Sequence, residues 1–159
     1  MAINLSGQLL AIDSMVFIYY LDPKEERLHT ASQQVIELLL KKRSQGVTSI
    51  VSVLETLSPS YYLTDQDRLE NYSLFFHSIP NLKIIEVDWD VALEAARLRR
   101  ENKSLRTPDS IQLATALIHK ADVFITNDDR LKNLSFPNLK ILPIFARGPL
   151  AKGDVTAKE

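Results

Sequence analysis

Short apolar runs alternate with longer stretches of helical periodicity along most of this chain. The longer stretches carry apolar residues three and four positions apart, which predicts amphipathic helices. We expect strands at the short apolar runs, which cover residues 9–12, 46–48, 82–87, 123–126 and 139–142. This alternation is typical of βα units, which build a parallel sheet covered by helices on both faces. The sequence therefore predicts a three-layer α/β/α fold around a parallel sheet of about five strands.

Capping residues and prolines predict where the helices begin and end. Gly46 is expected to cap the helix that starts near residue 25, and Thr64 with Asp67 resembles a capping box. Thr107 is expected to cap a helix over residues 108–120, with Pro108 as its first residue. Further helices are expected at residues 15–21, 50–58 and 89–102.

The length of 159 residues fits one domain, because domains commonly contain about 100 to 150 residues. Apolar residues make up 45% of the chain and charged residues 25%, so the chain can bury a core. We expect a single domain over residues 1–146. Residues 147–159 contain Gly and Lys but little apolar surface, which predicts a flexible C-terminal tail.

The composition excludes several classes of function. The chain has no Cys, which rules out thiolate zinc sites, iron–sulfur clusters and cysteine nucleophiles. Its four Gly residues do not form a dinucleotide fingerprint or a P-loop, so no nucleotide cofactor is expected. Nineteen Lys and Arg against twenty Asp and Glu leave a net charge of −1, so any binding of nucleic acid would depend on a local basic patch.

The N-terminal segment carries no basic stretch and no small-residue cleavage site of the kind found in signal peptides. The apolar run that follows is interrupted by Asp13, well before it could span a membrane. We therefore expect a cytoplasmic protein that does not bind a membrane.

Four acidic residues are expected to approach one edge of the sheet. Asp13 follows the first predicted strand and Asp128 follows the fourth, and the carboxyl ends of parallel strands share an edge. The helix before the fourth strand must run antiparallel to it, which brings Asp109 at the helix start to the same edge. Glu55 lies in the helix after the second strand, and its side chain leans toward the helix N-terminus and this edge.

Crowded carboxylates repel one another by roughly 4 kcal/mol at about 4 Å and an effective dielectric of 20. Proton uptake or a hard divalent cation would relieve this repulsion. No positive residue stands at the matching positions, which favours a cation, and the three His residues are distant in sequence from the acids. We therefore expect one or two Mg²⁺ or Mn²⁺ ions, which can activate water for phosphodiester hydrolysis without a histidine base.

Three segments of the chain resemble PIN-domain nucleases, above all the VapC-type ribonuclease toxins: LLAIDSMVFIYYLD, TSIVSVLET and RTPDSIQLATALIHKADVFITNDDRL. The resemblance spans residues 8–145. It implies metal-binding catalytic roles for Asp13, Glu55, Asp109 and Asp128, with Ser14 and Thr126 in support. Because Asp128 and Asp129 are consecutive, either could be the fourth ligand.

The same resemblance implies a strand order of 3-2-1-4-5 and RNA as the substrate. It also implies a homodimer and, among the toxins, an antitoxin whose C-terminal segment covers the cleft. Several basic residues precede Asp109, and the sequence suggests an RNA-binding role for Arg97, Arg100, Lys103 and Arg106. The alternative is a solvated helix face on which Glu94 and Glu101 pair with these cations.

The leading hypothesis is a Mg²⁺- or Mn²⁺-dependent endoribonuclease, most consistent with the toxin of a toxin–antitoxin pair. A housekeeping RNA-processing nuclease and a non-catalytic PIN-like module that binds RNA or protein are the alternatives. A pure binding surface would gain nothing from the repulsion among four acids. A phosphatase with Asp13 as nucleophile is disfavoured, because Met15 stands where its second acid would be expected.

Overall fold

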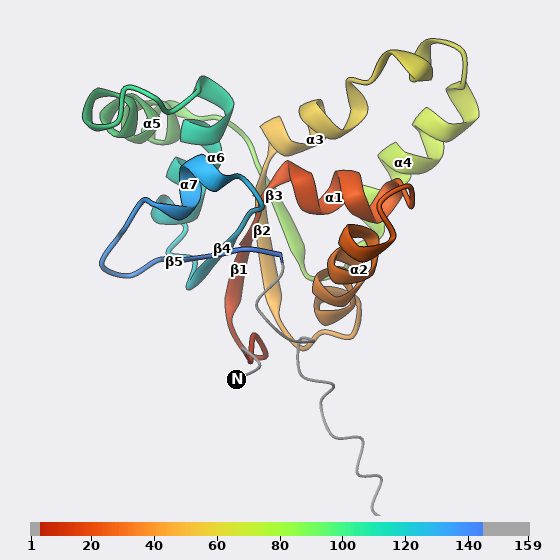
Figure 1. Cartoon of the computed structure of the whole chain (residues 1–159), viewed down its shortest axis with the longest axis horizontal. Coiled ribbons are helices and arrows are strands. Elements are labelled where there is room, and N and C mark those ends of the chain that lie inside the picture. Colours follow the sequence, from red (N-terminus) through yellow and green to blue (C-terminus); the bar gives the residue numbers. More distant parts are fainter. Residues whose placement is uncertain (1–3, 145–159) are drawn as a thin grey trace, which may run out of the picture.

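The computed structural model describes residues 4–144, and Figure 1 shows its central sheet. All strand pairs are parallel and the order is β3-β2-β1-β4-β5, which confirms the predicted sheet. The strands are β1 (Leu9–Ile12), β2 (Gln45–Ser49), β3 (Leu82–Ile85), β4 (Val123–Ile125) and β5 (Lys140–Leu142). The predicted tail over residues 147–159 lies outside the described residues.

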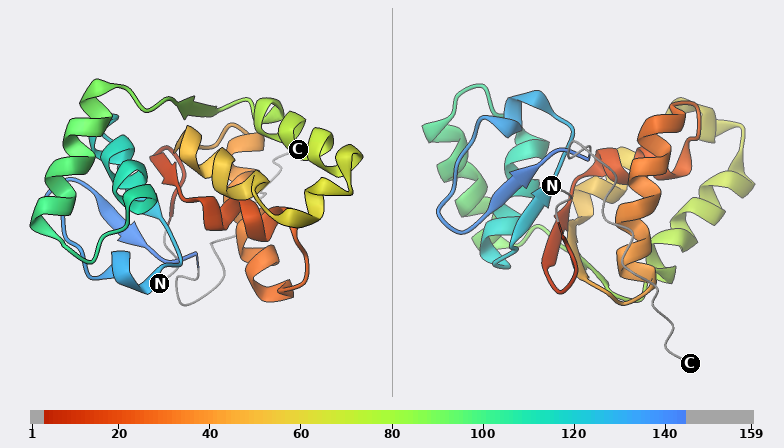
Figure 2. Two further views of the ribbon diagram at one scale, coloured as in Figure 1. Left: turned by 90° about the horizontal axis from the view of Figure 1, so that it is seen from above. Right: turned by 60° about the horizontal axis from the view of Figure 1, so that its bottom comes forward.

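Helices cover both faces of the sheet, as Figures 1 and 2 show from three directions. One face carries α1 (Ser14–Leu21), α2 (Glu26–Leu40), α3 (Ile50–Leu57), the 3₁₀ helix η1 (Ser60–Leu63) and α4 (Gln66–Ser78). The other face carries α5 (Trp89–Glu101), α6 (Thr107–Ile118) and α7 (Asp129–Lys132). The three predicted layers are therefore confirmed. None of the helices within residues 4–144 is long and apolar enough to cross a membrane.

The alternation of side chains along the central strands produces two cores. On β1, Leu10 and Ile12 face the core formed with α1, α2 and α4. Ala11, between them, faces the core formed with α5 and α6, and Phe124 of β4 joins it there. Because both faces of these strands are buried, the sequence of β1 and β4 is apolar without interruption until Asp13 and Thr126.

Gly46 does not cap α2, contrary to the prediction. The helix ends at Leu40, and Lys42 adopts the left-handed backbone conformation (φ 54°) in the turn that follows. Gly46 lies inside β2, where an added Cβ would come within 2.9 Å of Leu39 Cδ1. Close packing of α2 against β2 therefore explains this glycine.

The other two predicted caps are displaced by one residue. Asp65, not Thr64, caps α4, since its side chain accepts a hydrogen bond from the Arg68 N–H at 3.0 Å. Helix α6 includes Thr107, and Arg106 occupies the cap position. Pro108 still lies in the first turn of α6, where its missing N–H costs no helical hydrogen bond.

Candidate active site

Asp13 lies where β1 ends and α1 begins, at the carboxyl edge of the sheet. Its side chain is only 4% exposed, and both carboxylate oxygens accept hydrogen bonds from hydroxyl groups. Thr126 Oγ1 donates to Asp13 Oδ2 at 2.5 Å, and Ser14 Oγ donates to Oδ1 at 3.2 Å. The Asp13 side chain makes no cap hydrogen bond to α1, so its carboxylate does not stabilise the helix end.

The charge of Asp13 is only partly compensated. Burial raises the pKa of Asp13 to about 6, although the hydrogen bonds from Thr126 and Ser14 oppose the rise. The negative charges of Glu55 and Asp109 raise this pKa further. The structure therefore brings Asp13, Glu55 and Asp109 within electrostatic reach of one another.

Glu55 projects from α3, which follows β2 directly. Ser49 begins this helix, its Oγ accepting a hydrogen bond from the Val51 N–H at 3.2 Å. Across the site, Gln112 Nε2 of α6 donates to Glu55 Oε2 at 2.6 Å. Gln112 is not among the site residues predicted from the sequence. The signal was present, because Gln112 is a long amide in a stretch of α6 that is otherwise apolar or small.

Asp109 and Asp128 share a cationic neighbour, Arg130. Asp128 caps α7 by accepting the Arg130 N–H at 2.9 Å, and the Arg130 guanidinium also contacts both Asp128 oxygens. Arg130 Nη2 lies 3.5 Å from Asp109 Oδ2. Contrary to the expectation from the sequence, a positive residue therefore partly neutralises the acids in this part of the site. The two-residue step from Asp128 to Arg130 gave no periodic signal from which this contact could be predicted.

Arg130 affects the two carboxylates differently. Its hydrogen bonds hold the pKa of Asp128 below the ordinary value. Burial raises the pKa of Asp109, with Arg130 opposing that rise and Asp128 and Glu55 adding to it. Asp128 is thus electrostatically coupled to Asp109, which is itself coupled to the Asp13 end of the site.

Asp129 lies apart from this group. Its side chain is 91% exposed and pairs with Lys132 Nζ at 2.6 Å, whereas the Asp128 side chain is 18% exposed. Of the two consecutive acids, the geometry therefore favours Asp128 as a member of the site.

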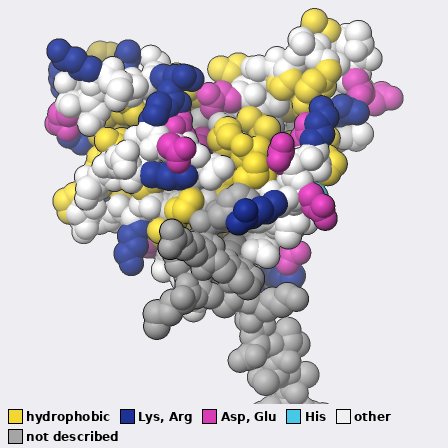
Figure 3. Space-filling view, in the orientation of Figure 1, with side chains coloured by type: hydrophobic (Ala, Val, Ile, Leu, Met, Phe, Trp, Pro, Cys, Tyr) yellow, Lys and Arg dark blue, Asp and Glu magenta, His cyan; other side chains and the backbone are white. Residues whose placement is uncertain are grey.

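The basic residues before Asp109 differ in their surroundings. Arg97 bonds Glu94 at 2.5 Å and Glu101 at 2.8 Å, so its charge is balanced on α5 itself, as the alternative interpretation of this stretch expected. Arg100, Lys103 and Arg106 are exposed. In Figure 3, Lys and Arg side chains gather on the arm that contains α5, beside the notch between the two groups of helices.

The sequence from residue 10 to residue 137 matches the family profile of the PIN domain. The chain belongs to the PIN domain family. No curated protein matches it significantly.

Several solved structures share this PIN fold at low sequence identity. The VapBC2 complex of Rickettsia felis, bound to promoter DNA, matches with a TM-score of 0.63 and 18% identity over 85% of this chain and 98% of that chain. DNA-bound VapBC of Salmonella typhimurium matches with a TM-score of 0.59 and 17% identity over 87% and 99% of the two chains. VapC20 of Mycobacterium tuberculosis, a toxin that cleaves the sarcin–ricin loop, matches with a TM-score of 0.58 and 12% identity over 73% and 86%.

The donor atoms around Asp13 suit a hard cation, because they are carboxylate and hydroxyl oxygens. Burial makes the negative charge of Asp13 unfavourable, and a bound cation would compensate it. As they stand, however, no three Asp, Glu or His side chains within residues 4–144 form a group that could hold a metal ion. The predicted acids therefore share one edge of the sheet without forming a closed set of ligands.

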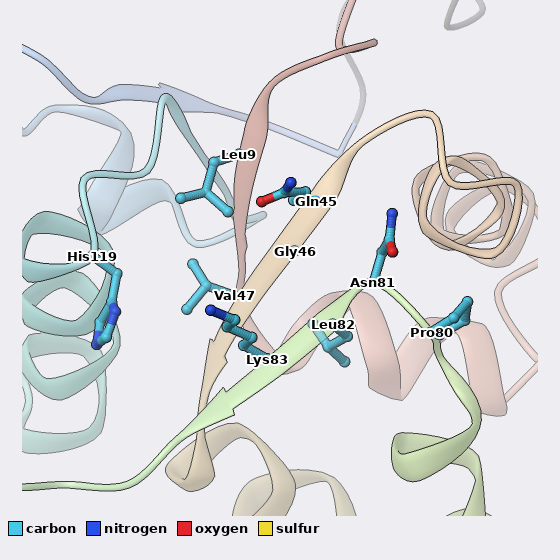
Figure 4. Close-up of a pocket in the computed structure, with 9 residues that line it drawn as sticks. All are labelled: Leu9, Gln45, Gly46, Val47, Pro80, Asn81, Leu82, Lys83 and His119. Atoms are coloured by element: carbon cyan, nitrogen blue, oxygen red, sulfur yellow. The ribbon is translucent and has the colours of Figure 1, made fainter.

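A cavity of about 390 Å³ lies at the other edge of the sheet, where β1, β2 and β3 begin (Figure 4). Its lining comprises Leu9, Gln45, Gly46, Val47, Pro80, Asn81, Leu82, Lys83 and His119. None of the four predicted acids lines this cavity, so it is separate from the candidate active site.

Proposed function

We propose that this PIN domain is a Mg²⁺- or Mn²⁺-dependent endoribonuclease that hydrolyses RNA phosphodiester bonds. The observation that carries the proposal is the Asp13 carboxylate, which two hydroxyl donors orient. Burial first, and repulsion from Glu55 and Asp109 second, make its negative charge unfavourable without a counter-charge. Membership in the PIN domain family supports the same conclusion.

In this proposal Asp13, Glu55, Asp109 and Asp128 hold the metal directly or through water. The bound cation would lower the pKa of a water molecule and stabilise charge on the phosphodiester oxygens. Thr126 and Ser14 orient the Asp13 carboxylate, since their hydroxyl groups occupy one lone pair on each of its oxygens. An ionised carboxylate has further lone pairs on both oxygens, which leaves Asp13 free to bind a cation.

Arg100, Lys103 and Arg106 are our candidates for contacts with RNA phosphates. Arg106 is near enough to lower the pKa of Asp109 and Asp128, so a phosphate bound there would lie beside the acids. Arg97 stays in this group as a weaker candidate, because Glu94 and Glu101 already balance its charge.

We further propose that the protein is a cytoplasmic toxin that forms a homodimer and pairs with an antitoxin. The similar structures from Rickettsia felis and Salmonella typhimurium are VapBC complexes, and VapC20 is a toxin that cleaves the sarcin–ricin loop. These likenesses support the toxin role without specifying the RNA that this chain cleaves.

The test is RNA cleavage by the purified full-length chain with Mn²⁺ or with EDTA. We expect cleavage with Mn²⁺, none with EDTA, and a loss of about 100-fold or more in Asp13→Asn, since even indirect supports of a metal contribute about 10- to 100-fold. Asp67→Asn, at an exposed position in α4, is the matched control and should cleave normally. Full activity of Asp13→Asn would refute the assignment.

A non-catalytic RNA-binding module is the second candidate, and the contacts of Arg130 favour it. Arg130 already neutralises part of the charge on Asp109 and Asp128, so those two acids have less need of a metal. RNA binding without cleavage, together with no uptake of Mn²⁺, would support this alternative.

A further inference from the structure

Gln112 is a buried polar side chain whose contacts point to the candidate active site. It lies on α6 one turn after Asp109, and residues three apart lie on the same side of a helix. The side chain is 3% exposed, and its Nε2 donates to Glu55 Oε2 at 2.6 Å. This hydrogen bond joins α6 to α3, which cover opposite faces of the sheet (Figure 1) and contact each other.

The other end of the Gln112 amide has no partner within residues 4–144. Its Oε1 is buried and accepts no hydrogen bond among the described residues. A buried acceptor without a donor loses the hydrogen bonds it made to water in the unfolded chain, which destabilises the fold. A Met side chain of similar length would fill the same volume without that cost, so packing alone does not explain Gln112.

The hydrogen bond from Gln112 restrains the flexible side chain of Glu55. A Glu side chain has several rotatable bonds, and fixing it in one orientation costs conformational entropy when a ligand binds. The bond from Gln112 Nε2 restrains Glu55 Oε2 beforehand and leaves the other carboxylate oxygen for the acidic edge. Thr126 and Ser14 restrain Asp13 in the same way, so the Asp13 and Glu55 carboxylates are both held by neutral donors.

We propose that Gln112 is a positioning residue that orients Glu55 for the bound cation. This role rests on the proposed function, because it acts only through a metal held at the acidic edge. Hydrogen-bond partners of metal ligands typically contribute about 10- to 100-fold in metal affinity, which sets the size of the expected effect.

The test compares Mn²⁺ affinity, measured by calorimetric titration of the full chain, with the melting temperature in EDTA. Gln112→Met should bind Mn²⁺ about tenfold more weakly than wild type, yet melt at the same or a higher temperature. The matched control is Thr115→Val on the same helix. Thr115 is 1% exposed and its Oγ1 bonds the Ile111 carbonyl at 2.8 Å, away from the acids, so this variant should keep wild-type affinity.

A double-mutant cycle shows whether Gln112 acts through Glu55. In a Glu55→Gln background, Gln112→Met should weaken Mn²⁺ binding no further, because the carboxylate that Gln112 orients is gone. An equal further loss in that background would overturn the positioning role.

Two more outcomes separate this inference from the proposed function. If wild type binds Mn²⁺ and Gln112→Met binds it with the same affinity, the positioning role alone is overturned. The positioning role is also overturned if the melting temperatures of both Gln112→Met and Gln112→Leu fall well below that of Thr115→Val. A wild-type chain that binds no Mn²⁺ would overturn the proposed function together with this role.

Discussion

Asp13 and Asp128 follow the neighbouring strands β1 and β4, yet their carboxylates lie in opposite electrostatic environments. Asp13 is buried among neutral hydroxyl donors, and burial raises its pKa to about 6. Asp128 is partly exposed and contacts a guanidinium, which holds its pKa below the ordinary value. A cation would therefore bind most favourably beside Asp13, whereas beside Asp128 it must compete with Arg130.

Thr126 connects these two environments. Its Oγ1 donates to Asp13 Oδ2 and also accepts the Asp128 N–H at 3.1 Å. One hydroxyl group thus orients the buried carboxylate and the backbone that carries the exposed one. The four acids are therefore not equivalent, although the sequence presents them as one set.

The largest expected difference between the Asp13 and Asp128 ends of the site is the effect of Asp13 on the free energy of unfolding as the pH changes. The pKa of Asp13 rises from an ordinary value of 3.8 to about 6 on folding. At about 1.4 kcal/mol per pKa unit, ionising Asp13 therefore costs about 3 kcal/mol more in the folded protein than in the unfolded chain. Between pH 4 and pH 6 the folded state holds a proton that the unfolded chain has lost. Stability from this group is therefore present below about pH 4 and is lost as the pH rises through about 6.

Asp13→Asn isolates this contribution. In EDTA, urea unfolding should show the variant more stable than wild type by up to about 3 kcal/mol at pH 7.5, with the difference vanishing near pH 4. A difference between the two proteins that does not change with pH would contradict the account of Asp13.

The second effect breaks the connection between the two ends. Thr126→Val keeps the shape of the side chain but removes the hydroxyl that lowers the pKa of Asp13, so this pKa should rise further. We expect Mn²⁺ affinity to fall by about 10- to 100-fold, measured by calorimetry. Thr126→Ser keeps the hydroxyl and should restore most of the affinity. Wild-type affinity in Thr126→Val would show that orientation of Asp13 does not matter.

The smallest effect concerns the Asp128 end. Arg130→Leu removes the cation that competes at Asp128 and Asp109, so Mn²⁺ affinity should rise by about two- to fivefold, the range of exposed ion pairs. The control is Lys41→Leu, which removes an exposed ion pair at 2.7 Å between Lys41, just after the end of α2, and Glu37; it should not change Mn²⁺ affinity. A weaker affinity in Arg130→Leu would mean that Arg130 supports the site and does not compete there.

The layers could be predicted from the sequence because strands buried on both faces are continuous apolar runs. The strand order came from the resemblance to PIN-domain nucleases and not from these runs. Gly46 was misassigned because a glycine between a helix and a strand fits a helix cap and a close contact equally well. Only the position of Leu39 against β2 distinguishes the two. The choice of Asp65 over Thr64 as a cap likewise depends on the path of η1, which periodicity does not encode.

The sheet edge at which the acids lie could also be predicted from the sequence, because the topology places the strand ends and the start of α6 together. The contacts of the acids could not be. Arg130 reaches Asp128 and Asp109 through the turn into α7, and Gln112 reaches Glu55 across two helices that are distant in the chain. Side-chain partners of this kind depend on three-dimensional packing, and no spacing rule predicts them.

The most direct test of the account is a calorimetric titration of the metal-free full-length chain with Mn²⁺ at pH 7. We predict saturable binding that raises the melting temperature and that Asp13→Asn abolishes, because the uncompensated charge lies at Asp13. A wild-type chain that takes up no Mn²⁺ and melts at the same temperature with Mn²⁺ and with EDTA would contradict it.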